Sequence, residues 1–500
     1  MGLPWRSSAP KLDVAYVSPD GGDAAEGTEE APFASLARAL RTDRSKIVLL
    51  PGTFPEPQVV VSRAVRIEAS ALGQAILDGH LFISASEVSV AGVNVTGGVG
   101  VHLAHDVVIS SATVAYGLKD DAVSVVSSEV RLVDLHLSCG PETCLQVTTS
   151  TVDVSNVVAR ADAGSKRVVR VESSRATVHR LMTFGGDITQ LQASLHSNLR
   201  VTTATLAGSG GSGLAALQDS LLEASDVHVI AARRAGCLVQ RARAQVTSST
   251  FDAQTGQGVA LSGAHLTLRS STVTPARDGA LQVAGYSGQP SRLELVGGVV
   301  QHGEHSGVLV SGGLVHVDGT RFEGAGEGTD VDAILATGLG NRVEVVRATF
   351  LRPPGFAVAV HQDALATVTA TVIEPGLGGV LVDDVAVDKV FVTGMVVRGC
   401  RQGSGVVALQ SPMVEVRGGR VEGCVEAGYL AGEGSGVVVR GARAVGNIQY
   451  GFAAFGGSSM SLEGVQASGS RWAAFAACGD GSRVVADAES VLEGATVLCP

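Results

Sequence analysis

The chain has 500 residues, a formal net charge of −11, 64 glycines and an apolar content of 45%, which suits short strands and tight turns rather than disorder. Lysine and arginine form no basic cluster, so the sequence argues against nucleic acid as a partner. No apolar run approaches the roughly 18–20 residues of a membrane helix. We expect residues 1–15, which lack the apolar core of a signal peptide, to be a disordered or processed tail.

The first predicted elements lie in residues 16–80. This segment contains three short motifs, Tyr16-Val17-Ser18, Gly27-Thr28 and Pro51-Gly52-Thr53-Phe54. In these motifs, the segment closely resembles the opening of the pectate-lyase-like right-handed parallel β-helix superfamily. The resemblance implies the first coils and a short capping helix at Phe33–Leu40, because an uncapped first coil would expose apolar interior and free strand edges. It implies a fold rather than an activity, since the superfamily includes lyases, hydrolases, epimerases and adhesins.

Residues 81–500 repeat with a period of about 22 residues. In each repeat a small residue opens an apolar run with period-2 alternation, which is typical of a strand with one buried face. We therefore predict an all-β, single-stranded right-handed parallel β-helix, a β-solenoid of about 17–19 coils that ends in a C-terminal cap. A β-propeller is the alternative, but its blades need about 40–50 residues. The openers are Gly100, Ala122, Cys144, Val168, Thr189, Gly213, Gly236, Gly258, Gly279, Gly307, Ala333, Ala357, Gly379, Gly405, Gly428, Gly451 and Ala473.

Alignment of the last repeats places Cys400, Cys424, Asn447 and Ser470 at one turn position, which predicts a stacked polar ladder. Stacked coils lie about 5 Å apart, within disulfide range, so Cys400–Cys424 is a candidate disulfide. Further candidate cysteines are Cys139 with Cys144 and Cys478 with Cys499, which leaves Cys237 as a buried thiol. Disulfides would favour an oxidising compartment, whereas seven reduced cysteines would favour an intracellular scaffold.

One turn position on three consecutive coils collects polar residues and is the candidate functional edge. Carboxylates, an imidazole and a guanidinium gathered there can act as acid and base, or bind Ca²⁺ at Asp278, Asp330 and Asp332. Solvated turn residues are the alternative, because turns favour Asp in any case. The candidate residues are Arg277, Asp278, His302, Glu304, His305, Asp330 and Asp332.

Two further groups of residues carry weaker signals. We interpret Lys119-Asp120-Asp121 as a solvated corner. The C-terminal aromatic residues favour a stack in the core or cap, with a sugar-stacking platform as the alternative. They are Tyr429, Tyr450, Phe452, Phe455, Trp472 and Phe475.

The family motifs for known activities are missing. Tyr450-Gly451-Phe452 lacks the Asp-Pro-His continuation of the epimerases, and the Gly-His-Gly element of the hydrolases is absent. We therefore predict a non-catalytic extracellular or cell-envelope protein that presents a rigid surface to a polysaccharide or an envelope protein. It would be secreted, periplasmic or on the outer surface of a bacterium, with calcium as the one cofactor considered and the oligomeric state open. The alternative is a carbohydrate-active enzyme, a polysaccharide lyase or glycoside hydrolase acting on an acidic polysaccharide.

Overall fold

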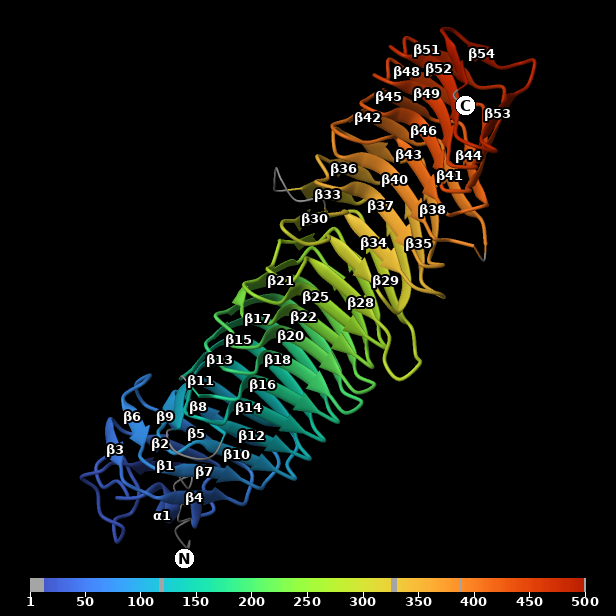
Figure 1. The fold of residues 1–500 in the computed structure, drawn as a ribbon. Coiled ribbons are helices and arrows are strands. Elements are labelled where there is room, and N and C mark those ends of the chain that lie inside the picture. Colours follow the sequence, from blue (N-terminus) through green and yellow to red (C-terminus); the bar gives the residue numbers. More distant parts are fainter. Residues whose placement is uncertain (1–12, 117–120, 163, 325–330, 387, 499–500) are drawn as a thin grey trace, which may run out of the picture. The chain divides into compact units, whose positions relative to one another are not determined.

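The computed structural model describes residues 13–116, 121–162, 164–324, 331–386 and 388–498. It divides into two compact units, Met1–Leu222 (unit 1) and Glu223–Pro500 (unit 2). Each unit is a stack of parallel β coils, about 19 turns in the two together (Figure 1). The predicted all-β parallel β-helix is thereby confirmed, and with it the fold that the N-terminal resemblance implied. No helix in the described part of the chain is long and apolar enough to span a bilayer.

In each unit, one strand of every coil joins a parallel sheet, called here the front sheet of that unit. In unit 1 its strands are β4 (Gln58–Val61), β7 (His80–Ile83), β10 (Val99–His102), β12 (Val123–Val126), β14 (Thr143–Thr148), β16 (Arg167–Glu172), β18 (Thr189–Ser194) and β20 (Ser212–Leu217). In unit 2 they are β22 (Ala235–Gln240), β25 (Gln257–Ser262), β28 (Leu281–Ala284), β31 (Val308–Val310), β34 (Ile334–Thr337), β37 (Phe356–His361), β40 (Gly378–Asp383), β43 (Val406–Leu409), β46 (Ala427–Gly432), β49 (Tyr450–Phe455), β52 (Ala473–Cys478) and β55 (Thr496–Leu498).

The other strands complete the coils on the remaining sides. In unit 1 they include β1 (Val14–Val17), β2 (Lys46–Leu49), β5 (Val65–Ala69), β11 (Val107–Tyr116), β13 (Glu129–Cys139), β15 (Thr151–Ala161), β17 (Arg175–Phe184) and β19 (Asn198–Ala207). In unit 2 they include β27 (Thr272–Val273), β30 (Val299–His302), β41 (Val390–Thr393), β44 (Val414–Arg417), β47 (Gly436–Arg440), β50 (Ser459–Glu463) and β53 (Arg483–Ala486).

In these strands, buried and outward-facing side chains alternate with a period of two residues. In β16, Val169 and Val171 point inward and are buried, whereas Arg170 and Glu172 face outward. Each predicted opener lies in a front-sheet strand or within two residues of its start. The sequence repeat is therefore the coil repeat.

The turn ladders are made by side chains that satisfy the backbone of the preceding coil. The Asn447 side-chain oxygen accepts a hydrogen bond of 2.9 Å from the Cys424 backbone N–H, and Asn447 is fully buried. In unit 1 the same role falls to serine hydroxyls: the backbone N–H of Ser128 donates to Ser150 Oγ at 3.1 Å, and that of Ser150 to Ser174 Oγ at 3.0 Å. These contacts hold one coil in register with the next.

Helix α1 spans Leu36–Leu40 and packs near β1, β2 and β4. It begins later than the predicted Phe33, because Phe33 forms a parallel bridge with Val17 and is therefore extended. Ser35 is the N-cap, and its Oγ accepts a hydrogen bond from the Arg38 N–H. That this short helix caps the first coil stays a prediction.

Two of the candidate disulfides are formed, Cys139–Cys144 and Cys400–Cys424. Cys237 is a buried free thiol, and burial raises its pKa to about 12. The third candidate pair includes Cys499, which lies outside the described residues.

The C-terminal aromatic residues separate into two groups. Tyr429 and Phe452 are buried and stacked, with ring centroids 5.1 Å apart and planes within 9°. This pair forms the predicted core stack. Trp472, in contrast, is 56% exposed.

Candidate functional site

Four residues of the predicted polar edge lie on turns of unit 2. Arg277 and Asp278 are exposed between β27 and β28, and Glu304 and His305 are exposed between β30 and β31. No hydrogen bond or salt bridge joins these four side chains to one another within the described ranges. Asp332 Oδ1 accepts a hydrogen bond of 2.8 Å from the Phe356 backbone N–H. Side chains of turn residues often bond to the backbone in this way.

The functional role of this edge stays a prediction. Asp330, one of the three candidate calcium ligands, lies outside the described residues. Among the residues that are described, no group of three His, Cys, Asp or Glu side chains is placed to hold a metal ion.

His302 differs from its neighbours on this edge because its side chain lies inside the coil. It is 1% exposed at the end of β30, and neither ring nitrogen has a hydrogen-bond partner within the described residues. Burial lowers the pKa of its imidazole to about 4, since the charged form would lose its hydration. His302 is therefore neutral and internal rather than available to a ligand on the surface.

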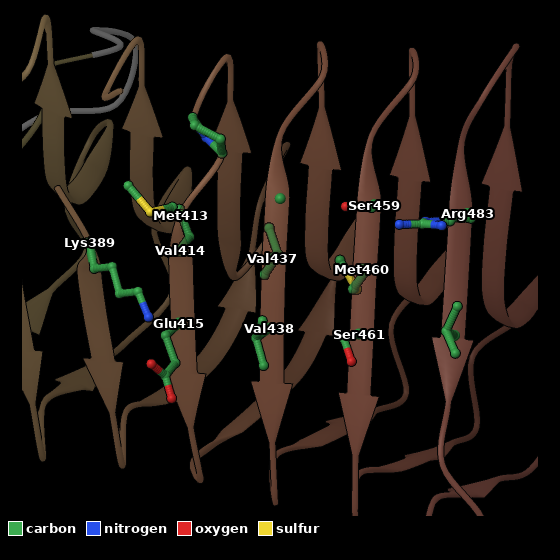
Figure 2. A pocket seen from close by; sticks show the side chains of 13 residues that line it. Lys389, Met413, Val414, Glu415, Val437, Val438, Ser459, Met460, Ser461 and Arg483 are labelled. Atoms are coloured by element: carbon green, nitrogen blue, oxygen red, sulfur yellow. The ribbon is translucent and has the colours of Figure 1, made fainter. Parts of the chain in front are cut away.

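A second surface of unit 2 is a groove of about 630 Å³ that crosses β44, β47, β50 and β53 (Figure 2). Met413, Val438 and Val485 give it an apolar lining, and Lys389 and Arg483 stand at its ends. Glu415 is 7% exposed, and Arg417 and Arg440 each bind it at 2.8 Å.

The charges around Glu415 are paired with one another. The hydrogen bond from Arg417 and the positive charges of Arg417, Arg440 and Lys389 outweigh desolvation and lower the pKa of Glu415. Arg440 also binds Glu463 at 2.9 Å. The two arginines that meet Glu415 are therefore already held by carboxylates.

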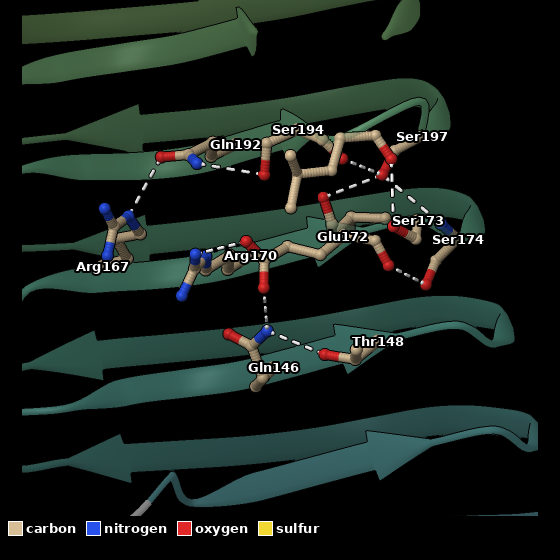
Figure 3. A network of polar contacts seen from close by, with 12 residues as sticks. Gln146, Thr148, Arg167, Arg170, Glu172, Ser173, Ser174, Gln192, Ser194 and Ser197 are labelled. Carbon is tan, nitrogen blue, oxygen red and sulfur yellow. Dashed lines mark hydrogen bonds and ion pairs between the residues drawn. The ribbon is translucent and has the colours of Figure 1, made fainter. Parts of the chain in front are cut away.

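A network of polar contacts lies on the outward face of the front sheet of unit 1 (Figure 3). In-register pairing aligns Ser124, Gln146, Arg170 and Gln192 on four successive coils. Gln146 Nε2 donates to Glu172 Oε2 at 3.2 Å and to Thr148 Oγ1 at 3.0 Å. Arg170 forms a salt bridge with Glu172. The Glu172 carboxylate thus holds both the Gln146 amide and the Arg170 guanidinium in place.

Arg167 on this face is held by an amide rather than by a salt bridge. Its Nε donates to Gln192 Oε1 at 3.0 Å, and it forms no salt bridge within the part of the chain that the structure describes. Desolvation, followed by repulsion from Arg170, lowers the pKa of Arg167, and attraction from Glu172 and Glu142 offsets this only in part. A half-buried cation whose charged state is disfavoured gains most from an anionic ligand, because the ligand would offset both effects.

A pocket of about 470 Å³ lies on the same sheet, a few coils toward the N-terminus. The rings of Phe82 and His102 meet in it with centroids 4.9 Å apart. It is lined by His80, Phe82, Gly100, His102, Asp121, Ser124 and Glu142. Asp121 Oδ1 accepts a hydrogen bond of 3.1 Å from the Thr143 N–H, and Lys166 binds Glu142 at 2.8 Å.

Gly100 makes room for this pocket. A Cβ at residue 100 would lie 3.2 Å from His80 Cε1 and from Phe82 Cδ2, and 3.7 Å from His102 Nε2. The absent side chain therefore lets three rings gather around one backbone position. Two imidazoles and two carboxylates next to an aromatic ring can bind a sugar and exchange protons with it.

Sequence reasoning missed this face. Asp121 belongs to the segment interpreted as a solvated corner, whereas Lys119 and Asp120 lie outside the described residues. A signal was present: Gln146 and Arg170 each stand two residues after their openers, and Gln192 stands three after its own. Polar residues at that outward position on three successive coils mark a polar stripe.

No family model and no curated protein matches the chain. Among solved structures it is similar to the A-module of the mannuronan C-5 epimerase AlgE6 of Azotobacter vinelandii, with 15% identity, a TM-score of 0.30, and coverage of 67% of this chain and 92% of that one. A rhamnogalacturonan lyase matches with 10% identity, a TM-score of 0.18, and coverage of 68% and 82%. The PL6 family alginate lyase AlyGC matches with 9% identity, a TM-score of 0.19, and coverage of 90% and 97%. Similarity at this level does not establish an activity for the chain.

Proposed function

We propose that this protein is a carbohydrate-active enzyme that acts on an acidic polysaccharide bound along the front sheet of unit 1. The observation that carries the proposal is Arg167, a half-buried guanidinium that is held by an amide and forms no salt bridge among the described residues. A uronate carboxylate has the charge and the planar geometry that a guanidinium binds best.

The surroundings of Arg167 support a polysaccharide rather than a small anion. Gln146, Arg170 and Gln192 extend the polar surface over neighbouring coils, and coils repeat at about 4.8 Å. A chain of sugar rings laid across the strands would meet amide and guanidinium groups repeatedly. The pocket around Gly100 then supplies carboxyl and imidazole groups suited to general acid–base chemistry.

The two described disulfides support a place outside the reducing cytoplasm. Cys139–Cys144 closes a short loop that carries Glu142, one of the residues of the pocket. Disulfides of this kind persist in secreted and periplasmic proteins. We therefore include export in the proposal.

Incubation with alginate, polygalacturonate and neutral polysaccharides, followed by mass analysis of the products, tests the proposed activity. We expect shortened or unsaturated oligosaccharides from an acidic polymer, and their loss in Asp121→Asn and Arg167→Gln. Arg131→Gln is the matched control, because Arg131 is exposed on β13 of the same unit. If the polymer stays unmodified but binds the wild type and not Arg167→Gln, the proposed enzyme activity is overturned and the protein is a glycan-binding protein. Absence of both product and retention would overturn the site.

A further inference from the structure

Three partly exposed aromatic side chains form a cluster on and beside the front sheet of unit 2. The Tyr450 ring centroid lies 5.8 Å from that of Phe455 and 5.8 Å from that of Trp472. The planes meet at 60° in the first pair and 84° in the second, which are favourable tilted and edge-to-face arrangements. Trp472 is 56% exposed, and Tyr450 and Phe455 are half-buried.

The rings lie outward because the sheet beneath them is made of alanine. Ala427, Ala453 and Ala476 are fully buried under Tyr450 and Phe455, with Leu430 and Val497 beside them. Methyl side chains leave the sheet flat, so the rings rest on its outer surface instead of entering the coil. The inward positions of the same strands hold the separate buried pair Tyr429 and Phe452.

The platform is fixed by backbone hydrogen bonds. The Trp472 N–H donates to the Gln449 carbonyl at 3.2 Å, and the Arg471 N–H donates to the Asn447 carbonyl at 3.1 Å. Tyr450 N–H donates to the Glu426 carbonyl at 2.9 Å. Tyr450 and Trp472 are thus held by backbone bonds to the coil before them, and Phe455 ends strand β49, which reduces the ordering cost of binding.

We infer that the platform formed by Tyr450, Phe455 and Trp472 binds a neutral polysaccharide, by stacking the C–H faces of its pyranose rings on the aromatic rings. This site is separate from the acidic polysaccharide of the proposed function. The turns at the Tyr450 and Trp472 end of the platform, residues 425–427, 448–450 and 470–472, contain one acidic and one basic residue, Glu426 and Arg471. The turns at the Phe455 end contain Glu433 and Asp480. Without an excess of positive charge, the platform lacks the attraction for anions that Arg167 provides in unit 1.

The size of the platform favours a glycan over a protein partner. Three large aromatic side chains bury about 150–250 Å² each when fully covered. Since all three are partly covered already, they offer on the order of 300 Å², well below the roughly 800 Å² per partner of a stable protein interface. A few sugar rings fit that area.

Tryptophan fluorescence tests the inference directly. The chain has two tryptophans, so Trp5→Phe leaves Trp472 as the sole reporter in the full-length protein. We expect a saturable change in emission on titration with cellohexaose or mannohexaose, and no comparable change with an oligoalginate. In affinity electrophoresis through a neutral β-glucan, Trp472→Ala should weaken retention about tenfold, and Trp472→Phe should restore most of it.

Tyr286→Ala is the matched control, because Tyr286 is a partly exposed tyrosine of unit 2 in contact with Arg241. Unchanged emission across the neutral panel, or equal retention of Trp472→Ala and the Tyr286 control, would overturn the inference. So would dimers that Trp472→Ala converts to monomers in sedimentation, since the occupant would then be a second copy. Arg167→Gln should leave neutral-glycan binding intact, so a failure here is distinguishable from a failure of the proposed function.

Discussion

The Nε atom of Arg167 donates a 3.0 Å hydrogen bond to Oε1 of Gln192, which lies one coil further along the front sheet of unit 1. An amide positions the guanidinium without cancelling its charge, whereas Glu172 cancels that of the neighbouring Arg170. The contrast between two arginines three residues apart is what makes this face a candidate for anions.

Glu172→Gln should strengthen the binding of an acidic polysaccharide. The substitution keeps the size of the side chain but leaves Arg170 without its carboxylate, so the face gains one positive charge. We expect the affinity at low salt to rise roughly threefold to tenfold and the gain to shrink as salt is added. Isothermal titration with oligoalginate at two salt concentrations measures it. Glu129→Gln, an exposed position on β13, should give no such gain; equal gains would point to net charge alone.

Gly100→Ala should reduce activity with little loss of stability. The new methyl group would meet the His80 and Phe82 rings at 3.2 Å, so the rings must shift and the pocket must narrow. We expect a loss of turnover of about tenfold or more, because small displacements of positioned groups are costly to catalysis. Gly22→Ala is the control, since a Cβ there meets nothing within 4 Å. Full activity of the Gly100 variant would separate this pocket from the reaction.

Asn447→Ala should destabilise unit 2. The substitution leaves the buried Cys424 N–H without the acceptor that now lies 2.9 Å away. An unsatisfied buried donor costs about 1–3 kcal/mol. Urea unfolding followed by circular dichroism measures the free energy of unfolding, with the exposed Gln466→Ala as the comparison. A change no larger than that of the comparison would show that water replaces the ladder contact.

Stability should fall as the pH drops from 6.5 toward 4. The pKa of His302 is about 4 in the folded protein, against the ordinary value of 6.5 that it regains on unfolding. Between these values the unfolded chain binds more protons, so the free energy of unfolding falls by up to about 1.4 kcal/mol per pH unit, on the order of 3 kcal/mol in all. Above pH 6.5 this contribution is constant.

Denaturant unfolding of the wild type and of His302→Leu at pH 4.5 and 7.5 isolates the contribution of His302. We expect the difference between the two pH values to be smaller in the variant, because leucine binds no proton. Identical pH dependence in both proteins would contradict a buried neutral imidazole at this position.

The sequence by itself determined the coil. Alternation of apolar residues within each repeat, and the spacing of the small openers, are local properties that favour stacked strands of this length over the longer blades of a propeller. Cys400, Cys424 and Asn447 were predictable for the same reason, since they occupy one turn position in repeats of nearly equal length.

Only the tertiary structure decided which outward side chains meet. Gln146, Arg170 and Gln192 are 22–24 residues apart, and whether they form a network depends on register and rotamer, which the repeat does not specify. His302 differs from these residues, because the alternation of β30 already places it inward with Val300, and the prediction of a surface edge overlooked that phase. The burial and the hydrogen-bond partners of a side chain depend on residues from adjacent coils, and those residues take their positions only when the coils stack.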